Sequence, residues 1–331
     1  MRLSAALAGV LFSSALYAAE APIAVPVELK LLAEHPIDGM PSGNLSGLSR
    51  CGNEWQAVSD HDDNRLYRLQ PQDTAWTAEA EHFDVPPPPA SGLPWGLRMR
   101  TWAANILRGA DMDFEGLSCD SLGNRYLASE AHAAVLQVTP GGQAEWLNLP
   151  GNLVRQARAS GMLLHYNAQL EGVSIAPDGK RLWLAAERER RGLLVLHKPN
   201  SSWTCSGGCV LLSQAGKEPS VAEPNSGISL PRDFSDVHFF KEKLFTLERA
   251  AHRICRRDLN AGKVEKCWSF AAAALADARR YSGPFGVAEA LWLDADGAWL
   301  GVDNGDAHRD DGEERPLIWH FAAPKGGWSA P

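Results

Sequence analysis

The stretch D-F-E-G-L-S, residues 113–118, places a glutamate and a glycine in front of a short apolar run. A close copy, Q-L-E-G-V-S, returns at residues 169–174, and a looser copy, N-L-S-G-L-S, stands at residues 44–49. A phrase that recurs in this way indicates an internal repeat, and a missed repeat misassigns a whole fold. The phrase therefore decides how the rest of the chain is divided.

Aligned on this phrase, the chain divides into five units, each with an apolar run, a turn and a second apolar run. The turns contain Gly-Asn, Asp-Gly and similar pairs, which supply the positive φ that tight hairpins need. The units are residues 46–60, 115–130, 171–187, 236–248 and 289–303. Third strands are predicted at residues 65–69, 134–138, 193–196, 252–258 and 317–321, and fourth strands at 76–83, 144–149, 210–213 and 264–270.

This pattern predicts an all-β fold, namely a β-propeller whose four-stranded blades stand radially around a channel. We count five blades, and the alternative is a sixth blade in a segment assigned as a loop. The fifth unit has no fourth strand of its own, and an N-terminal strand at residues 25–32 would close that last blade. An all-β sandwich with accidental similarity between the units is the competing interpretation.

The composition is that of a globular protein with a large core, since 45% of the 331 residues are hydrophobic and 22% are charged. Residues 1–19 have the pattern of a secretory signal peptide, with Arg2, an uncharged apolar run and small residues for cleavage. We expect one domain over residues 20–331, periplasmic or secreted, with no membrane segment after cleavage. The formal charge of -8 argues against nucleic acid as a partner. The sequence does not indicate an oligomeric state.

All six cysteines follow the predicted signal peptide, and an even number in an exported protein favours disulfides. The pairs that we expect are Cys205 with Cys209, Cys255 with Cys267, and Cys51 with Cys119. The alternative is that the cysteines are reduced and buried. Metal binding is disfavoured because no cluster of histidine and cysteine accompanies them.

Nearly every unit opens and closes with an acid. The first strand of a propeller blade lines the channel and the second runs back beside it, so both positions lie at the same channel mouth. The acids are Asp60, Glu115, Glu130, Glu171, Glu187, Asp236, Glu248, Glu289 and Asp303, and Ser46 is the exception. Crowded carboxylates need raised pKa values or bound cations, and a ring of hard oxygen ligands suits Ca²⁺ better than Mg²⁺. The competing interpretation is that some acids pair with arginines, because Arg188 and Arg249 directly follow Glu187 and Glu248.

Four long connections between units, residues 84–111, 150–169, 214–233 and 271–284, turn over at the same face as the acids. Connections of this length in a compact domain are often binding loops, and the second of them has a helical pattern. Their arginines would suit an anionic ligand, such as a phosphoester, that a metal bridges. The candidate substrate-binding residues are Arg98, Arg100, Arg188 and Arg249.

A serine esterase would need a nucleophile, a base and an oxyanion hole, and the sequence has no G-x-S-x-G. Ser118 and Ser174 lie within predicted strands, and we interpret them as packing residues. His61, in S-D-H-D-D-N, and His238, on the first strand of the fourth unit, are the candidate catalytic residues. For His61 the competing interpretation is a solvated loop histidine.

The phrase E-G-[LV]-S, followed by a turn and S-E or E-R, and later by E-A-L-W-L and V-D-N-G, resembles the phytase-like family. That family is described as having the esterase-like activity of phytase, and the resemblance covers roughly residues 40–322. It implies an exported propeller that hydrolyses phosphate or carboxylic esters, with calcium that binds phosphate and activates water. By resemblance, Glu115, Glu171, Asp236, Glu289 and Asp303 would hold the metal. Ser46 departs from this pattern, and Asp60 or Asp62 would compensate.

The main hypothesis is therefore an exported, metal-dependent ester hydrolase, of the phosphoesterase or phytase-like kind, with Ca²⁺ at the channel mouth. Its substrate would be a small anionic ester. The alternative is a non-catalytic propeller that binds a protein or a cell-envelope ligand, in which calcium is only structural.

Overall fold

The computed structural model describes residues 26–330, except residues 109–110, 306 and 308 and the side chains of residues 105–108. The predicted signal peptide lies outside the described residues. Strands dominate the described part of the chain, which confirms the all-β prediction, and three helices lie in the connections between sheets. None of the helices in the described ranges is both long enough and apolar enough to cross a membrane.

The first two strands of each sequence unit are adjacent and antiparallel, as the repeat predicts. The pairs are β3 (Leu45–Cys51) with β4 (Glu54–Ser59), β7 (Phe114–Cys119) with β8 (Arg125–Ser129), β11 (Leu170–Ile175) with β12 (Arg181–Ala186), β17 (Asp236–Phe240) with β18 (Lys243–Glu248), and β21 (Ala288–Leu293) with β22 (Gly297–Val302).

The predicted third and fourth strands follow these pairs in the same sheets. The third strands are β5 (Arg65–Gln70), β9 (Ala134–Val138), β13 (Arg190–His197), β19 (Arg253–Arg257) and β23 (Leu317–Ala322). The fourth strands are β6 (Trp76–His82), β10 (Ala144–Trp146), β14 (Val210–Ala215) and β20 (Val264–Ser269).

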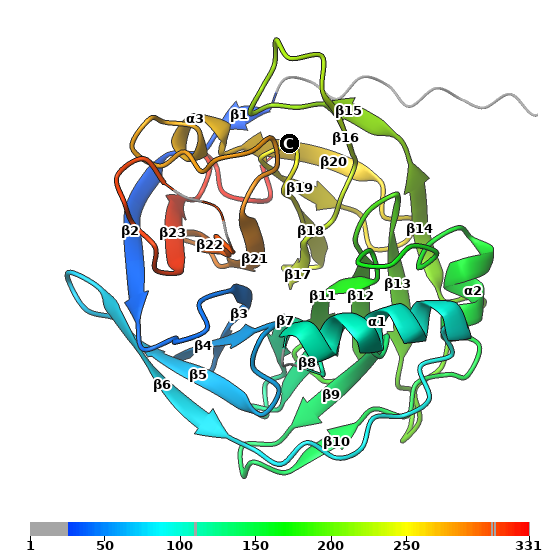
Figure 1. Cartoon of the computed structure of the whole chain (residues 1–331). Helices are drawn as coiled ribbons and strands as arrows, with labels where there is room; N and C mark the ends of the chain where they lie inside the picture. The colour runs from blue at the N-terminus through cyan, green and yellow to red at the C-terminus, as the bar shows by residue number, and fades with distance from the viewer. Residues whose placement is uncertain (1–25, 109–110, 306, 308, 331) are drawn as a thin grey trace, which may run out of the picture.

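The first strands of the sheets surround the centre of the molecule (Figure 1). Following the chain, β3, β7, β11, β17 and β21 each contact the next, and β21 contacts β3 again. The ring is therefore closed, and the sheets extend outward from it, which is a propeller-like arrangement. We call β3, β7, β11, β17 and β21 the inner strands.

An N-terminal strand closes the last sheet, as predicted, but its bounds differ from the prediction. β2 (Leu31–Asp38) pairs antiparallel with β23, and its last residues pair with β6, so that two sheets join into one of eight strands. Residues 27–28 form a separate strand, β1 (Val27–Glu28), which runs parallel to β20. The predicted strand at residues 25–32 is thus divided, because Leu29 is buried against Trp268 and Phe270 and the chain changes sheets there. Residue 25 lies outside the described residues.

The core lies in the spaces between neighbouring sheets. Between the sheets of β11 and β17, the rings of Trp183 and Phe239 stack with their centroids 4.8 Å apart. Val237 and Leu244 are buried in the same cluster. Clusters of this kind between neighbouring sheets fix the inner strands by hydrophobic burial and so hold their ends in defined positions.

Three disulfides form with the predicted pairings: Cys51–Cys119, Cys205–Cys209 and Cys255–Cys267. The first joins β3 to β7 and so links two neighbouring inner strands. The third joins β19 to β20 directly across their antiparallel pairing.

The long connections carry most of the remaining structure. The first contains α1 (Trp95–Arg108), which the sequence does not predict, and the second contains α2 (Leu153–Ala159), where the helical prediction is confirmed. The third contains a hairpin of β15 (Lys217–Pro219) and β16 (Ser229–Pro231), and the fourth contains α3 (Ala271–Ala274). In Figure 1, α1 crosses in front of the sheets that contain β7 and β11.

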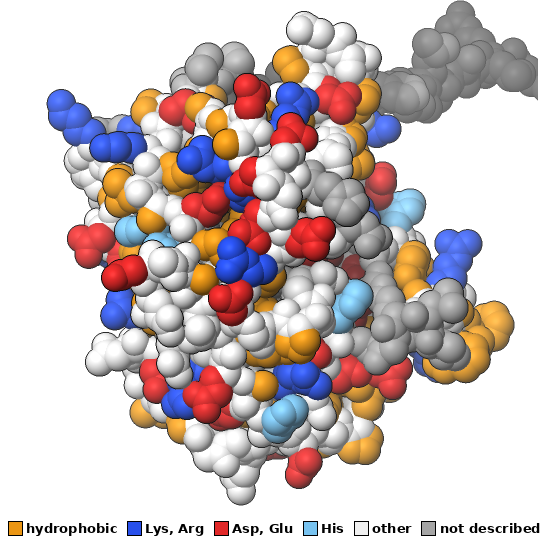
Figure 2. All heavy atoms as spheres, turned by 60° about the vertical axis from the view of Figure 1, so that its left-hand side comes forward, with side chains coloured by type: hydrophobic (Ala, Val, Ile, Leu, Met, Phe, Trp, Pro, Cys, Tyr) orange, Lys and Arg blue, Asp and Glu red, His pale blue; other side chains and the backbone are white. Residues whose placement is uncertain are grey.

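The charged surface is mixed on the face that Figure 2 shows, where acidic and basic side chains alternate with hydrophobic ones. A long stripe of basic side chains is not seen on the described part of this face.

Candidate functional site

The acid of the repeated phrase is placed by a β-bulge. In β7 and β11, Phe114 and Gly116 pair with consecutive residues of the neighbouring strand, and so do Leu170 and Gly172. Glu115 and Glu171 are the extra residues at these shifts. Ser46 in β3 and Glu289 in β21 stand at the same kind of shift. A bulge redirects a side chain away from the ordinary alternation of a strand, so this device sets the direction of the opening residue in four of the inner strands.

The glycine of the phrase allows neighbouring inner strands to approach closely. A Cβ added to Gly116 would lie 2.6 Å from the carbonyl oxygen of Glu171 and 2.9 Å from the nitrogen of Val173. A Cβ added to Gly47 would lie 2.8 Å from the nitrogen of Leu117. Real Cβ atoms do not come so close to a backbone, so glycine is required here for packing around the channel.

The serine of the phrase connects one inner strand to the next. The hydroxyl of Ser118 accepts a hydrogen bond from the backbone nitrogen of Ile175 at 3.1 Å. The hydroxyl of Ser174 accepts one from the backbone nitrogen of Phe239 at 2.8 Å. Both serines are buried and satisfy backbone groups of the neighbouring strand, which is a structural role and agrees with their interpretation as packing residues.

The fourth unit uses its acid differently. β17 pairs with β18 without a bulge, and Asp236 is buried. Its carboxylate accepts hydrogen bonds from the backbone nitrogens of Val237 and Leu291, each at 2.7 Å. Burial raises the pKa of Asp236, and these two hydrogen bonds oppose that rise. Asp236 therefore links β17 to β21, and its carboxylate is committed to the backbone instead of the channel mouth.

Two groups of acids form where the inner strands begin and the strands beside them end. The first acid group consists of Asp60, Asp113 and Glu115, and in it one ligand atom of each residue lies within 4.8 Å of the others. Burial raises the pKa of Glu115 well above its ordinary value, and the neighbouring carboxylates of Asp60, Asp113, Glu130 and Asp303 raise it further. The acids of three different sequence units thus act on one carboxyl group.

The second acid group consists of Glu130, Glu171 and Glu187, with the same 4.8 Å limit, and all three residues are buried. Burial, followed by the charge of Asp113, raises the pKa of Glu130, and burial, followed by the charge of Glu187, raises the pKa of Glu171. Oε2 of Glu187 is buried and receives no hydrogen bond from any described residue. A buried carboxylate oxygen without a donor is costly, so this atom is suited to a cation.

Arg249 is the main counter-charge of the second acid group. Its guanidinium donates to Glu187 Oε1 at 2.6 Å, forms a short hydrogen bond with Glu289, and lies 3.4 Å from Asp233 Oδ2. Arg249 thereby links Glu289 to Glu187. Oε2 of Glu289 is a second buried carboxylate oxygen without a hydrogen-bond donor in the described structure. Arg188 also forms a short hydrogen bond with Glu187, and it donates to the carbonyl oxygen of Asn167 at 2.6 Å. The pairing of acids with Arg188 and Arg249, considered from the sequence, is therefore present for Glu187 and Glu289.

Glu248 lies outside both acid groups although it closes its unit as the others do. Its buried carboxylate contacts the guanidinium groups of Arg191, Arg253 and Arg257 at 2.9, 2.5 and 2.6 Å. Burial alone would raise its pKa, but the three arginines together hold the pKa of Glu248 well below its ordinary value. With its charge compensated in this way, Glu248 is a structural anion.

The two candidate histidines occupy different positions. His61 is exposed, and its Nε2 lies 3.6 Å from Asp60 Oδ2, beside the first acid group. His238 lies further along β17, where its ring is 6.0 Å from that of Trp292. Burial lowers the pKa of His238 to about 4, so its imidazole is neutral near pH 7. Arg98 and Arg100, the other candidate binding residues, are exposed on α1.

Two functional candidates were not among the residues selected from the sequence. Asp113 belongs to the first acid group, and it stands two residues before Glu115 in the quoted phrase. Asp233 is buried beside Arg249 and accepts from the nitrogen of Ala250 at 3.2 Å. Burial raises the pKa of Asp233 to about 6. In both cases an acid stands just ahead of the residue that opens a unit. The sequence could therefore have indicated these two residues as neighbours of the recurring acids.

The phytase-like family model, described as esterase-like activity of phytase, matches residues 40–196 and confirms the resemblance over that part of the chain. A comparison with curated proteins gives no match.

Among solved structures, glutaminyl cyclase from Myxococcus xanthus aligns with a TM-score of 0.51 and 12% identity, covering 90% of this chain and 97% of that chain. Virginiamycin B lyase from Staphylococcus aureus aligns with a TM-score of 0.40 and 12% identity, covering 90% of this chain and all (100%) of that chain. Aldose sugar dehydrogenase from Streptomyces coelicolor, in its PQQ-bound form, aligns with a TM-score of 0.38 and 14% identity over 90% and 82% of the two chains. The first of these alignments shows a similar fold.

Proposed function

We propose that this protein, whose residues 40–196 carry the phytase-like family sequence, is an exported ester hydrolase that works with Ca²⁺ at its channel mouth. Its substrate class is a small anionic ester, in the first place a phosphoester. We take the fold as five blades, counting the eight-stranded sheet as two. The three disulfides support a periplasmic or secreted location, because such bonds persist in oxidising compartments.

The second acid group fits a calcium ion in the chemistry and spacing of its ligands. Two oxygens bound to one Ca²⁺ at ordinary distances are at most about 5 Å apart, and the ligand atoms of Glu130, Glu171 and Glu187 lie within 4.8 Å. The oxygen of Glu187 that has no donor supplies a further argument, because a bound cation would satisfy it. The single observation that supports the proposal best is this buried, partly unsatisfied group of three carboxylates.

A bound Ca²⁺ would polarise a phosphoryl oxygen and lower the pKa of a bound water. The protein's own residues would position the substrate and accept a proton. Arg249 fixes Glu187 and Glu289, so it holds the ring instead of the substrate. The side chain of Arg188 is 30% exposed and is the better placed of the two arginines to contact an anion. His61 is the better placed of the two histidines to accept a proton, because it is exposed beside Asp60.

The test combines calcium binding with hydrolysis. Mature protein is stripped with chelator, and calorimetric titration and thermal unfolding are measured with Ca²⁺ and with Mg²⁺. Calcium at 100 times its dissociation constant should stabilise the fold by about 2.7 kcal/mol. Release of phosphate and of alcohol is then followed on 4-nitrophenyl phosphate and 4-nitrophenyl acetate.

The matched variants are Glu171→Gln, in the second acid group, and Glu145→Gln, an exposed position at the outer edge of the sheet that contains β7. We expect Glu171→Gln to weaken calcium binding and hydrolysis together, and Glu145→Gln to change neither. Stabilisation by Ca²⁺ without hydrolysis of any ester would favour the non-catalytic propeller with structural calcium. An absence of calcium binding would remove the metal from the mechanism.

A further inference from the structure

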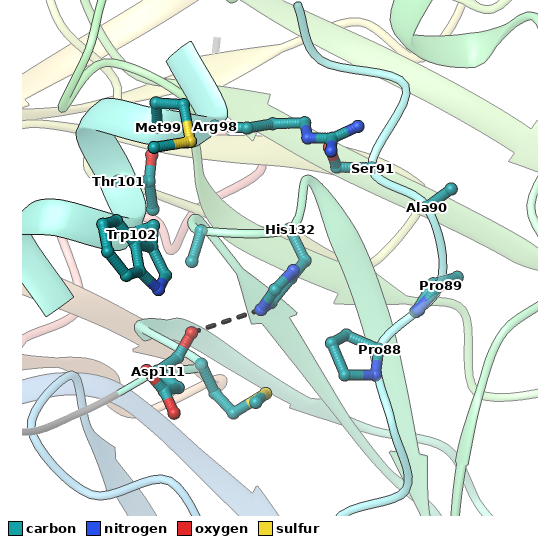
Figure 3. A pocket seen from close by; sticks show the side chains of 12 residues that line it. Pro88, Pro89, Ala90, Ser91, Arg98, Met99, Thr101, Trp102, Asp111 and His132 are labelled. Carbon is teal, nitrogen blue, oxygen red and sulfur yellow. Dashed lines mark hydrogen bonds between the residues drawn. The ribbon is translucent and has the colours of Figure 1, made fainter. Parts of the chain in front are cut away.

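A cavity of about 590 Å³ lies between α1 and residues 88–91. Its volume is within the range of small-molecule sites, which is about 300–1,000 Å³. Figure 3 shows Trp102 and Met99 of α1 on one side, Pro88 and Pro89 on the other, and His132 between them. We call this space the α1 cavity.

Residues that line the α1 cavity are adjacent in sequence to an acid of each group. Asp111 and Met112 line it, and the next residue is Asp113 of the first acid group. Ala131 and His132 also line it, and the residue before them is Glu130 of the second acid group. Neighbouring Cα atoms are about 3.8 Å apart, so the Cα atoms of Met112 and Ala131 in the lining lie at about that distance from those of Asp113 and Glu130.

The walls of the α1 cavity are held in place independently of any ligand. The carboxylate of Asp63 accepts hydrogen bonds from the nitrogens of Asp111 and Met112, at 2.6 and 2.8 Å. On the opposite side, the indole nitrogen of Trp146 donates to the carbonyl oxygen of Pro86 at 2.8 Å and fixes the start of the proline run. Walls held in this way form a site with a defined width, as ligand sites usually have.

The helix that forms the third wall is anchored at its start. Leu93, just before the helix, is buried in the core, and Leu97 in its first turn packs against the same cluster. The apolar side chains further along are nevertheless turned outward, since Trp102 is 57% exposed and Met99 is 39% exposed. Large apolar side chains that line a cavity and remain this exposed indicate a site for an apolar ligand group.

The chemistry of the lining distinguishes between two kinds of ester. A polyol that carries many phosphates would need several cationic groups to match its charge. Among the described residues that line the α1 cavity, Arg98 is the one guanidinium, and Trp102, Met99 and the prolines offer apolar surface. An aromatic ring or another flat apolar group can stack on the indole and on the proline rings.

We propose that the α1 cavity binds the alcohol portion of the substrate, and that this portion is an aromatic or flat apolar group. The acidic portion of the same ester would lie at the neighbouring acid groups, so this inference rests on the proposed function. The substrate class is thereby narrowed to monoesters of aromatic alcohols, and Trp102 is the main residue that selects them.

The test uses phenyl phosphate, methyl phosphate and the non-hydrolysable phenylphosphonate, all with Ca²⁺. Trp102→Ala is compared with Trp95→Ala, which removes the same side chain from an exposed position on the same helix that does not line the cavity. For Trp102→Ala we expect a loss of about tenfold in kcat/KM on phenyl phosphate, with methyl phosphate unchanged. Trp95→Ala should leave both substrates unchanged, and Trp102→Phe should restore most of the loss.

Calorimetric titration with phenylphosphonate separates this inference from the hydrolase proposal. Binding that Trp102→Ala weakens and Trp95→Ala does not would support the α1 cavity even if no ester is hydrolysed. If Trp102→Ala and Trp95→Ala changed kcat/KM equally on phenyl phosphate and on methyl phosphate, the inference would be overturned. The hydrolase proposal itself would still stand. Failure of the wild-type protein to bind phenylphosphonate would overturn it as well.

Discussion

Gly172→Ala tests whether the glycine of the repeated phrase is required for inner-strand packing. The added Cβ would lie 2.7 Å from Asp236 Oδ1 and from the nitrogen of Val237. An ordinary van der Waals contact needs about 3.4 Å or more, so β11 and β17 must separate or Asp236 must move. Movement of Asp236 would disturb its 2.7 Å hydrogen bond from the nitrogen of Leu291, and with it the contact between β17 and β21.

The expected cost follows from these two effects. Overpacking of a close contact costs about 1–3 kcal/mol, and a weakened hydrogen bond to a buried carboxylate costs about 1.5–3 kcal/mol. Since the strands can relax in part, we expect the free energy of unfolding to fall by about 3 kcal/mol in all.

The assay is equilibrium unfolding in urea, followed by circular dichroism and by tryptophan fluorescence. The matched control is Gly151→Ala, because a Cβ at Gly151 meets no atom within 4 Å. We expect a lower midpoint with an unchanged slope for Gly172→Ala, and a midpoint close to that of the wild type for Gly151→Ala. Equal midpoints for the two variants would refute the role of close packing at this glycine.

Three further predictions concern the charges and the disulfides. Glu248→Gln leaves Arg191, Arg253 and Arg257 without their carboxylate, and should cost about 3–5 kcal/mol in urea unfolding. Because the folded-state pKa of Glu248 is lowered, its contribution in the wild type is present above the ordinary glutamate pKa of about 4.3 and is lost as the pH falls below it. Urea midpoints between neutral and acidic pH should therefore fall less for Glu248→Gln than for the wild type, and parallel curves would contradict this assignment. Arg249→Gln removes the shared counter-ion of Glu187, Asp233 and Glu289. A bound Ca²⁺ would replace part of the lost positive charge, so the variant's loss of thermal stability should be larger in chelator than in excess Ca²⁺. An equal loss in both would argue against a cation at the second acid group. Replacing Cys51 and Cys119 by alanine removes a link across 68 residues, and the chain-entropy account predicts a loss of roughly 4 kcal/mol in the free energy of unfolding. The same replacement of Cys205 and Cys209, which are 4 residues apart, should cost about 2 kcal/mol. The reverse order of these two losses in urea unfolding would contradict this account.

The regular part of the fold could be predicted because it depends on local pattern. Apolar runs separated by Gly-containing turns identify the strands of each unit, and β9 has the predicted bounds, residues 134–138. The cysteine pairs could be predicted since two of them are close in sequence and the third remained. By contrast, α1 starts directly after Pro94 and carries exposed Trp95, Met99 and Trp102. A helix whose apolar residues face outward lacks the pattern of a core-facing helix, so periodicity does not reveal it.

The candidate site could be predicted only to the level of which ends of strands meet. The recurring acids indicated a shared channel mouth, and Glu115, Glu130, Glu171 and Glu187 do lie in two compact groups there. The exceptions depend on details that the phrase does not encode. In β17, which lacks the bulge, Asp236 accepts hydrogen bonds from backbone nitrogens. Glu248 forms ion pairs with arginines from β13 and β19. The contacts of Asp236 with Leu291 and of Glu248 with Arg191 come from strands far apart in sequence, and local pattern cannot specify them.

The pairing of β2 with β23 has a consequence for the order in which the protein can fold. Leu31 pairs with Phe321, so the first long strand of the chain finds its partner only when nearly the last residues are available. Contacts between residues so far apart in sequence form slowly, because a long loop must close first. During synthesis, which begins at the N-terminus, most of β2 would remain an unpaired edge until β23 has been made. Unpaired strand edges associate readily with other chains. Premature termination before residue 317 would leave that edge permanently open, so truncated products should aggregate instead of forming a smaller ring.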